Sequence, residues 1–556
     1  MDRYSFLFPV HREHRKKRAL IAWGDGLFLA FVMLFAFLAY QGALALSSDG
    51  ICIDSDLATY AQGMAGAAKP AFFFGDPIVA TPTQANSIPN AERMLASLLT
   101  PGDAYAIGLL RACAIILVVY FVSWYVFGRW LFHERLAAIL LVALVSITVW
   151  VGFGTFWGIT HSDPVPRVFH AALWPWMLML AILGFRHVAL RPLALFCAGL
   201  GMWLHGVSAL NTGAMIFCAF FFHRPKTCSL GRHGRVLGFS LLAFFVPVLL
   251  FLWPSLSQGQ SFTPEQLEIL AQAFMIRWHE DYGNIPGTLL SLVLPWNPIA
   301  YIGYAGLLAT LWCRFYPNDR LRDLSRMMPA FFFAMCCVIL FSLLETRYAA
   351  DFGRIPMGHE LVRGVKFFVP LFWIMICAFL VYFLKFLPKK GSTALVGLCI
   401  VSILVFSQDK QHIAAQYAIA AQTGIQLPLA EEGQRMAYAA DLAREAVMAV
   451  HERITPGDRA FCLEDSMMAL RYAGFCPLAY SFKDGYAFFY NKDYASMHEW
   501  MTITKAVAKG EEGIRDAIAM TKARWYLARQ SSHFGFEDTL TKVWENEAWK
   551  LYRVLP

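Results

Sequence analysis

Charged residues are scarce in this chain: they make up 15% of its 556 residues, whereas hydrophobic residues make up 58%. Soluble domains are usually only about 45–50% apolar. Long polar stretches between the apolar ones are scarce too, because apolar segments of membrane-spanning length recur and short basic loops separate most of them. This composition argues against a large soluble protein and favours a polytopic α-helical membrane protein.

Several chemical signatures are missing as well. The chain has no Cys-x-x-Cys metal-binding spacing, no P-loop and no dinucleotide-binding fingerprint. The net charge of +8 does not indicate a nucleic-acid partner, because the excess Lys and Arg lie beside the apolar segments. Most of the twelve cysteines fall in predicted spans. Cys462 and Cys476 lie outside the spans, so they form either a disulfide in an oxidising compartment or two free thiols.

The apolar windows predict about eleven membrane spans. A basic segment (residues 11–18) precedes the first window, which we interpret as an uncleaved span because it is long and lacks a convincing cleavage site. The windows at 193–204 and 209–222 are short, so they are either two re-entrant half-helices or one tilted helix. The predicted spans are residues 27–46, 107–127, 136–153, 169–183, 193–204, 209–222, 236–252, 289–312, 328–344, 367–383 and 395–406.

The basic residues between spans predict the orientation of the chain. If the N-terminus is cytoplasmic, alternation places the basic clusters at 129–135, 186–191, 224–235, 314–326 and 385–390 on the cytoplasmic side. The outer loops are longer and carry fewer basic residues. Merging the short pair of spans would reverse everything after it and break this bias, so eleven spans and an external C-terminus fit best.

This layout predicts two main parts. Residues 1–407 form the membrane domain, in which 47–103 is a first outer loop with two short interfacial helices. Residues 408–556 read as an external α/β domain, because a helical pattern at 439–452 alternates with strand-like segments. The predicted strands are 459–463, 478–482, 524–528 and 549–555, the last as an edge strand that ends the domain.

The first outer loop opens with an acidic motif, Asp54-Ser55-Asp56-Leu57-Ala58-Thr59-Tyr60. Carboxylates at the membrane boundary are costly and usually functional. On a helix Asp56 and Tyr60 share one face, whereas Asp54 and Asp56 diverge by about 200°. An ionised carboxylate here can deprotonate an acceptor hydroxyl or amine, or hold a divalent cation against a phosphate. Helix capping is the structural alternative for either aspartate.

A second group of candidates is cationic. The outer loop from 347 to 366 breaks the charge bias expected outside, since it carries Arg347, Arg354, Arg363 and Lys366. Arginine forks match phosphate oxygens, so these residues are candidates for binding a polyprenyl phosphate. Interfacial anchoring with Arg–Glu pairing is the alternative. The same two interpretations apply to a shorter loop that contains His161, Asp163, Arg167 and His170.

Together these features resemble the GT-C superfamily of integral-membrane glycosyltransferases, whose members start with one span and an acidic first outer loop. The run Asp56-Leu57-Ala58-Thr59-Tyr60-Ala61 looks like the Asp-Glu-x-x-Tyr-Ala opening of the aminoarabinose and related transferases. Asp56 takes the position of the catalytic aspartate. Leu57 replaces the usual second acidic residue, and Asp54 is the candidate to compensate. The segments 73–77, 166–169, 363–366 and 551–554 are similar to uncharacterised bacterial members.

The resemblance implies a multi-pass protein of a bacterial inner membrane with a periplasmic C-terminal domain. It implies an inverting transfer of a sugar from a polyprenyl-phosphate-linked donor to a glycan, lipid or protein acceptor, with Mg²⁺ or Mn²⁺ at Asp56 as one alternative. The implied catalytic residues are Asp56 and Asp54. The implied substrate-binding residues are Tyr60, Asp76, His161, Arg167, Arg347, Arg354, Arg363 and Lys366.

Two other functions remain open from the sequence. A transporter or flippase of a lipid-linked glycan would need a polar path through the bilayer, but the predicted spans offer chiefly Arg111 and His205 and no obvious inverted repeat. A non-catalytic scaffold for envelope polysaccharide assembly would tolerate replacement of Asp54 and Asp56. The partners expected in every case are membrane lipid and a lipid-linked sugar.

Overall fold

The computed structural model of the chain describes residues 18–53, 55–79, 90–159, 166–226, 228–257, 263–282, 284–352, 356, 358–485, 488, 493–532 and 539–555. Within these residues seven helices are long and apolar enough to cross a membrane, and four shorter apolar helices accompany them. This supports the predicted helical membrane architecture. The count of eleven spans stays a prediction, and most of the basic segment 11–18 lies outside the described residues.

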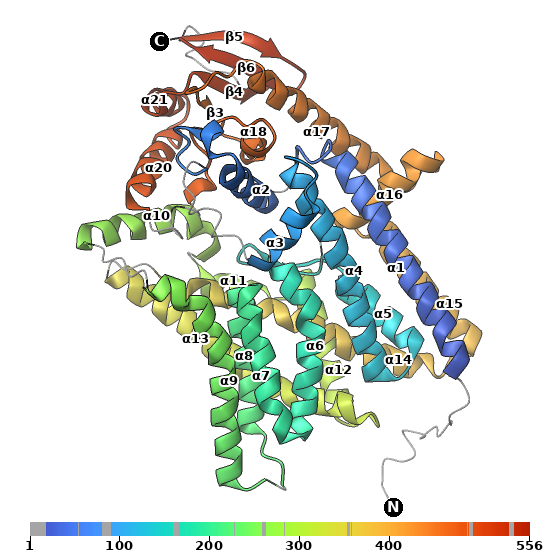
Figure 1. Ribbon diagram of the computed structural model, residues 1–556. Helices are drawn as coiled ribbons and strands as arrows, with labels where there is room; N and C mark the ends of the chain where they lie inside the picture. The colour runs from blue at the N-terminus through green and yellow to red at the C-terminus, as the bar shows by residue number, and fades with distance from the viewer. Residues whose placement is uncertain are drawn as a thin grey trace, which may run out of the picture.

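The long apolar helices form a bundle that occupies the lower part of the molecule in Figure 1. The N-terminal half of the bundle contains α1 (Arg18–Leu46), α4 (Tyr105–Phe132), α5 (Arg135–Ser146), α6 (Pro166–Arg186), α7 (Arg191–Leu200), α8 (Gly206–Phe222) and α9 (Leu230–Ser257). The remaining apolar helices are α11 (Ile285–Ser291), α12 (Pro298–Cys313), α13 (Asp319–Asp351), α14 (Phe368–Leu384), which follows the 3-10 helix η5 (His359–Phe367), and α15 (Lys389–Phe406).

Two predicted spans were wrong in their extent. Residues 136–153 do not form one helix, because α5 ends at Ser146 and the chain continues into the hairpin of β1 (Val149–Gly152) and β2 (Thr155–Trp157). The turn residues Phe153 and Gly154 have φ of 55° and 59°, the backbone that tight hairpins require. Residues 289–312 are also divided, because the Asn297 side chain caps a new helix, α12, that begins with a proline.

A mixed four-stranded sheet forms the top of the molecule, with strand order β3-β4-β6-β5. The strands are β3 (Ala460–Phe461), β4 (Trp525–Arg529), β5 (Leu540–Glu545) and β6 (Trp549–Val554), and the pair β3–β4 is parallel. The accompanying helices are α16 (Lys410–Thr423), α17 (Ala430–His451), α18 (Ala469–Tyr472), α20 (Tyr494–Val507) and α21 (Glu511–Thr521). The predicted edge strand, β6, lies inside the sheet between β4 and β5, and residues 478–482 contribute only a bridge from Leu478 to Ala460.

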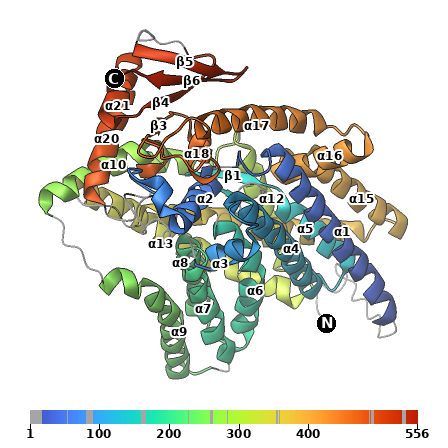
Figure 2. The ribbon, with the colours of Figure 1, turned by 45° about the horizontal axis from the view of Figure 1, so that its top comes forward.

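The first outer loop packs against this C-terminal part of the chain. The two helices predicted in the loop are α2 (Ser55–Ala68) and α3 (Asn90–Leu99). Helix α2 lies between α18 and α4 in both views of the ribbon (Figures 1 and 2). Its buried face, with Leu57 and Ala61, belongs to the same hydrophobic core as Phe461 and Leu470. Burial of this shared face fixes α2 relative to the C-terminal part.

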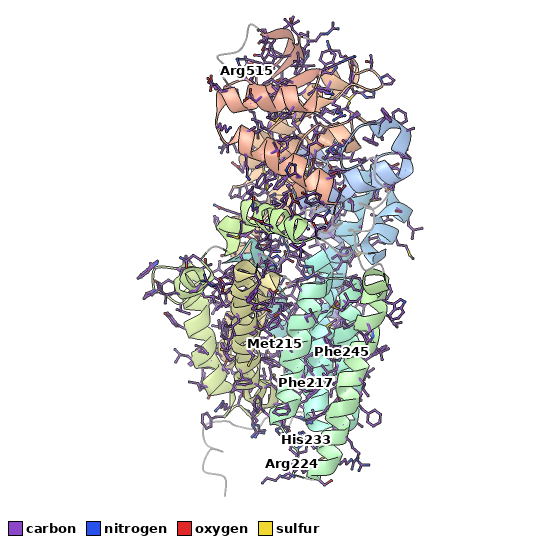
Figure 3. The ribbon with its side chains drawn as sticks, turned by 90° about the vertical axis from the view of Figure 1, so that its left-hand side faces the viewer. Met215, Phe217, Arg224, His233, Phe245 and Arg515 are labelled. Atoms are coloured by element: carbon purple, nitrogen blue, oxygen red, sulfur yellow. The ribbon has the colours of Figure 1, made fainter. Side chains whose placement is uncertain are left out.

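The molecule has two polar ends with the apolar bundle between them. Figure 3 places Arg224 and His233 at the tip of the bundle and Arg515 of α21 at the opposite end, with Met215, Phe217 and Phe245 between them. Helix α10 (Pro264–Tyr282) lies across the junction between the bundle and the C-terminal part in Figure 1. Helix α2 lies at the same junction, where the candidate site is found.

Candidate functional site

Asp56 stands in the first turn of α2 and faces away from the buried side of that helix. Leu57 and Ala61 are fully buried, whereas the Asp56 side chain is 40% exposed. Its Oδ1 lies 2.7 Å from Nζ of Lys483, and its Oδ2 lies 3.5 Å from a terminal nitrogen of Arg167. The carboxylate therefore joins three segments that are distant in sequence: the first loop, the start of α6 and the C-terminal part.

The β1–β2 hairpin orients two arginines toward this carboxylate. The carbonyl oxygen of Phe153 accepts a hydrogen bond from Nε of Arg363 at 2.8 Å, and that of Gly154 accepts one from Arg167 at 3.3 Å. The Arg167 guanidinium also stacks over the ring of Phe156, 4.7 Å from its centroid. The turn that interrupts the predicted span thus supplies the scaffold for both cations.

Lys366 adds a fourth cation and is the most buried of them. It is 3% exposed, and its Nζ lies 5.5 Å from the centroid of the Phe367 ring. The Lys366 ammonium forms no hydrogen bond or ion pair within the described part of the chain. It is close enough to Arg167 and Arg363 for electrostatic interaction with both. Glu360 neutralises part of the charge through an ion pair with Arg363 at 2.8 Å.

We call Asp56, Arg167, Glu360, Arg363, Lys366 and Lys483 the Asp56 cluster. It contains four cations and two carboxylates. Burial raises the pKa of the Asp56 carboxyl, but the charges of Lys483, Arg167 and Arg363 outweigh that effect and hold the pKa below its ordinary value. Asp56 is therefore ionised at neutral pH, and the cluster as a whole favours an anion.

A divalent cation would find few ligands among the described residues of the cluster, and Asp54, the other candidate carboxylate, lies outside the described residues. Both oxygens of the Asp56 carboxylate already face cationic side chains. Magnesium and manganese prefer several oxygen ligands, and among the described residues no group of three or more His, Cys, Asp or Glu side chains is placed to hold a metal. The reaction proposed for this site therefore takes no step through Mg²⁺ or Mn²⁺ at Asp56, which the sequence had left as one alternative.

The Asp76 carboxylate is occupied by hydrogen bonds within the protein, which does not support its predicted contact with substrate. It is fully buried, and its Oδ2 accepts hydrogen bonds from Nε of Arg471 at 2.8 Å and from the backbone nitrogen of Leu478 at 2.9 Å. Its Oδ1 accepts from the backbone nitrogens of Ile78 and Val79. These four donors occupy the carboxylate, so Asp76 connects the first loop with the C-terminal part.

The other predicted site residues fall into three groups. Tyr60 is half-buried, one turn after Asp56, and packs against both hydrophobic cores. Arg347 is 80% exposed near the end of α13, where it pairs with Asp351, so the structure does not place it with the Asp56 cluster. Three predicted residues lie outside the described residues: Asp54, His161 and Arg354.

Two members of the cluster were not predicted as site residues. Lys483 lies 427 positions after Asp56, in the largely apolar and aromatic run 478–489, and no motif marks it as a site residue. Glu360 was considered only as an arginine partner. The Phe153-Gly154 turn was also missed, although a glycine pair with one intervening residue at the end of an apolar run is a hairpin signal.

The cysteines of the C-terminal part are two free thiols. Cys462 and Cys476 are both buried, and neither forms a disulfide. The stability of this part therefore depends on packing and on polar contacts.

Neither a model of a known protein family nor a curated protein matches the sequence.

Proposed function

We propose that the protein is a membrane glycosyltransferase of the GT-C type in a bacterial inner membrane. It would transfer a sugar from a polyprenyl-phosphate-linked donor to an acceptor on the periplasmic side, with inversion at the anomeric carbon. The observation that carries this proposal is the Asp56 cluster, where the apolar bundle meets the C-terminal part. The ionised Asp56 carboxylate pairs there with Lys483 and Arg167, and Arg363 is close enough to interact with it.

The cations match the anionic part of such a donor. A lipid-linked sugar phosphate carries its hydrocarbon in the bilayer and its phosphate at the boundary, which is where apolar helices end beside Arg167, Arg363 and Lys366. Arginine guanidinium groups donate hydrogen bonds to phosphate oxygens, and a buried lysine adds a point charge. Lys366 is buried and forms no ion pair within the described residues, so a phosphate beside it would favour its charged form.

Asp56 supplies the chemistry on the acceptor. The acceptor oxygen attacks the anomeric carbon, the bond from that carbon to the phosphate oxygen breaks, and polyprenyl phosphate leaves with the electron pair. The acceptor proton passes to the Asp56 carboxylate as the new bond forms. The ionised carboxylate also stabilises positive charge that develops on the sugar ring, and the cations stabilise the departing phosphate.

The test uses the purified full-length protein in nanodiscs with polyprenyl-phosphate-linked sugars. Transfer to added bacterial lipids or glycans is followed by release of polyprenyl phosphate, and the anomeric configuration of the product is read by NMR. We expect turnover with inversion in the wild type and in Asp103→Asn, which changes an exposed carboxylate paired with Lys69 in the same outer loop. We expect none in Asp56→Asn. Equal turnover in Asp56→Asn would contradict the proposal.

A further inference from the structure

We propose that Arg471 is a positioning residue that holds Lys483 against Asp56, so that the C-terminal part of the chain completes the site. This inference rests on the proposed function for its consequence, but its geometry can be tested separately. It adds a role for a buried arginine whose five hydrogen bonds go to neither Asp56 nor Lys483.

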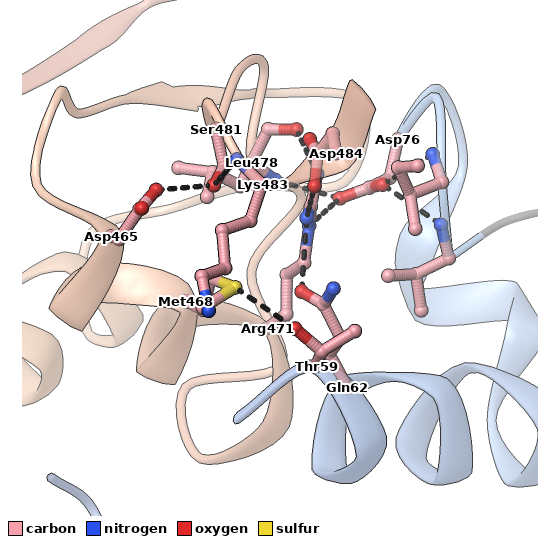
Figure 4. Close-up of polar contacts among 12 residues, drawn as sticks. Thr59, Gln62, Asp76, Asp465, Met468, Arg471, Leu478, Ser481, Lys483 and Asp484 are labelled. Atoms are coloured by element: carbon pink, nitrogen blue, oxygen red, sulfur yellow. Dashed lines mark hydrogen bonds and ion pairs between the residues drawn. The ribbon is translucent and has the colours of Figure 1, made fainter. Parts of the chain in front are cut away.

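The Arg471 guanidinium is completely buried and forms five hydrogen bonds (Figure 4). Its Nε donates to Asp76 Oδ2 at 2.8 Å. One terminal nitrogen donates to Gln62 Oε1 at 2.9 Å and to Asp484 Oδ1 at 2.7 Å. The other donates to Asp484 Oδ2 at 2.9 Å and to the carbonyl of Leu478 at 3.1 Å. The five donors of an arginine are all used.

These partners connect the two ends of the Asp56–Lys483 ion pair. Gln62 stands on α2, less than two turns after Asp56, and is buried. Asp484 is the residue directly after Lys483. The same guanidinium therefore holds both the helix that carries Asp56 and the segment that carries Lys483.

The segment around Lys483 is fixed from its other side as well. The backbone nitrogen of Lys483 donates to Oγ of Ser481 at 3.2 Å, and that hydroxyl donates to Asp465 at 2.9 Å. The carbonyl of Ser481 accepts from the indole nitrogen of Trp500 at 3.1 Å. Because its backbone is fixed in this way, the Lys483 side chain extends from a defined point toward Asp56 on α2.

Arginine is the residue that this position requires. A lysine has three donors on a single atom and cannot reach two carboxylates, an amide and a carbonyl in one plane. Replacing a buried ionic group by apolar residues often leaves stability unchanged, so stability alone does not explain the network. We infer that the network is needed to hold Lys483 in position.

Zero-length cross-linking measures how close the Lys483 amine lies to the Asp56 carboxylate, without any assay of sugar transfer. A carbodiimide activates the Asp56 carboxylate, the Lys483 amine attacks it, an amide forms, and the carbodiimide leaves as a urea with the elements of water. Mass spectrometry of the digested full-length protein in nanodiscs measures the yield. The Lys542–Glu545 pair, with atoms 2.9 Å apart in β5, reports the reaction and the folded sheet in the same sample.

We expect an Asp56–Lys483 cross-link in the wild type and none in Lys483→Met. In Arg471→Lys the yield should fall about tenfold, because moving two reacting groups apart by about 1 Å lowers the rate of their reaction far more than twofold. Arg524→Lys is the matched control, because it changes another arginine–aspartate pair of the C-terminal part, between Arg524 and Asp458. Its yield should equal the wild-type yield. An unchanged Asp56–Lys483 yield in Arg471→Lys, with Lys542–Glu545 retained, would overturn the inference.

If Arg471→Lys does not fold, Gln62→Met decides the question. It removes only the bond from Arg471 to α2, so the yield should fall relative to Lys542–Glu545, and an unchanged yield overturns the inference. The proposed function fails by a different result. A normal cross-link in a protein whose transfer does not depend on Asp56 would reject the catalytic role of Asp56 and leave the positioning by Arg471 intact.

Discussion

Nζ of Lys483 lies 2.7 Å from Oδ1 of Asp56, although the two residues are 427 positions apart. The contact brings the C-terminal part of the chain directly to the acidic motif of the first loop. It also lowers the pKa of Asp56, more than any other single charge. The site is therefore made of pieces from both ends of the sequence.

The pH dependence of transfer should follow the Asp56 carboxylate. Because its pKa is depressed in the folded protein, the ionised form and its ion pairs persist above that pKa and are lost as the pH falls through it. Lys483→Met removes the strongest depressing charge, so the acid limb of the activity profile should move to higher pH. The measurement is initial transfer rate against pH for both proteins. An identical acid limb would show that Lys483 does not act on the catalytic carboxylate.

Replacing Lys366 by Met should weaken the binding of polyprenyl phosphate without lowering the thermal stability of the protein. Burying a lysine that forms no ion pair in the described part of the chain costs free energy, so Lys366→Met should leave the melting temperature in detergent unchanged or raise it. Its affinity for polyprenyl phosphate should fall by about 1.5–3 kcal/mol, the worth of a charged hydrogen bond. Lys385→Met, at the other end of α14, is the control and should bind like the wild type. Unchanged affinity in Lys366→Met would remove Lys366 from the site.

Asp76→Asn should destabilise the protein by disrupting the Arg471 network. Breaking a buried ion pair typically costs about 3–5 kcal/mol because a charge is left uncompensated. Asp103→Asn, which breaks a partly exposed pair with Lys69, should cost at most about 1 kcal/mol. Thermal unfolding and limited proteolysis of the C-terminal part compare the two variants. If both variants melt alike, Asp76 does not fasten the first loop to the C-terminal part.

The thiols of Cys462 and Cys476 should both be free in the native protein. Alkylation after unfolding in the absence of reductant should label both residues, and prior reduction should add no label. Because both side chains are buried, neither should react before unfolding. A gain of two labels after reduction would demonstrate a disulfide and contradict the structure.

The sequence predicted the membrane helices well where the apolar run was long and unbroken, as in residues 27–46 against Trp23–Leu46 in the structure. It was wrong where glycine and proline break the run, because the apolar composition continues through the β1–β2 hairpin and across the start of α12. Strand β5 was missed, since most of its residues are exposed and it lacks a clear apolar alternation.

The candidate site could be predicted only in part. Asp56, Arg167, Arg363 and Lys366 stood out because charges near apolar segments are unusual, and the structure brings them together. Lys483 lies outside the predicted spans and no motif marks it, so only the fold reveals it. Asp76 was assigned to substrate because segment 73–77 resembles bacterial GT-C members, but in the structure its carboxylate binds Arg471, which lies 395 positions away.

The central claim is that Asp56 performs sugar transfer, and its most direct test compares cells with the wild type, a deletion and Asp56→Asn at equal membrane abundance. Envelope glycans and lipid-linked sugars are analysed in each. We predict that Asp56→Asn matches the deletion, with the same sugar missing from the envelope and its polyprenyl-phosphate donor accumulated. If Asp56→Asn matches the wild type while the deletion does not, the protein acts by transport or as a scaffold, and a catalytic role for Asp56 is contradicted.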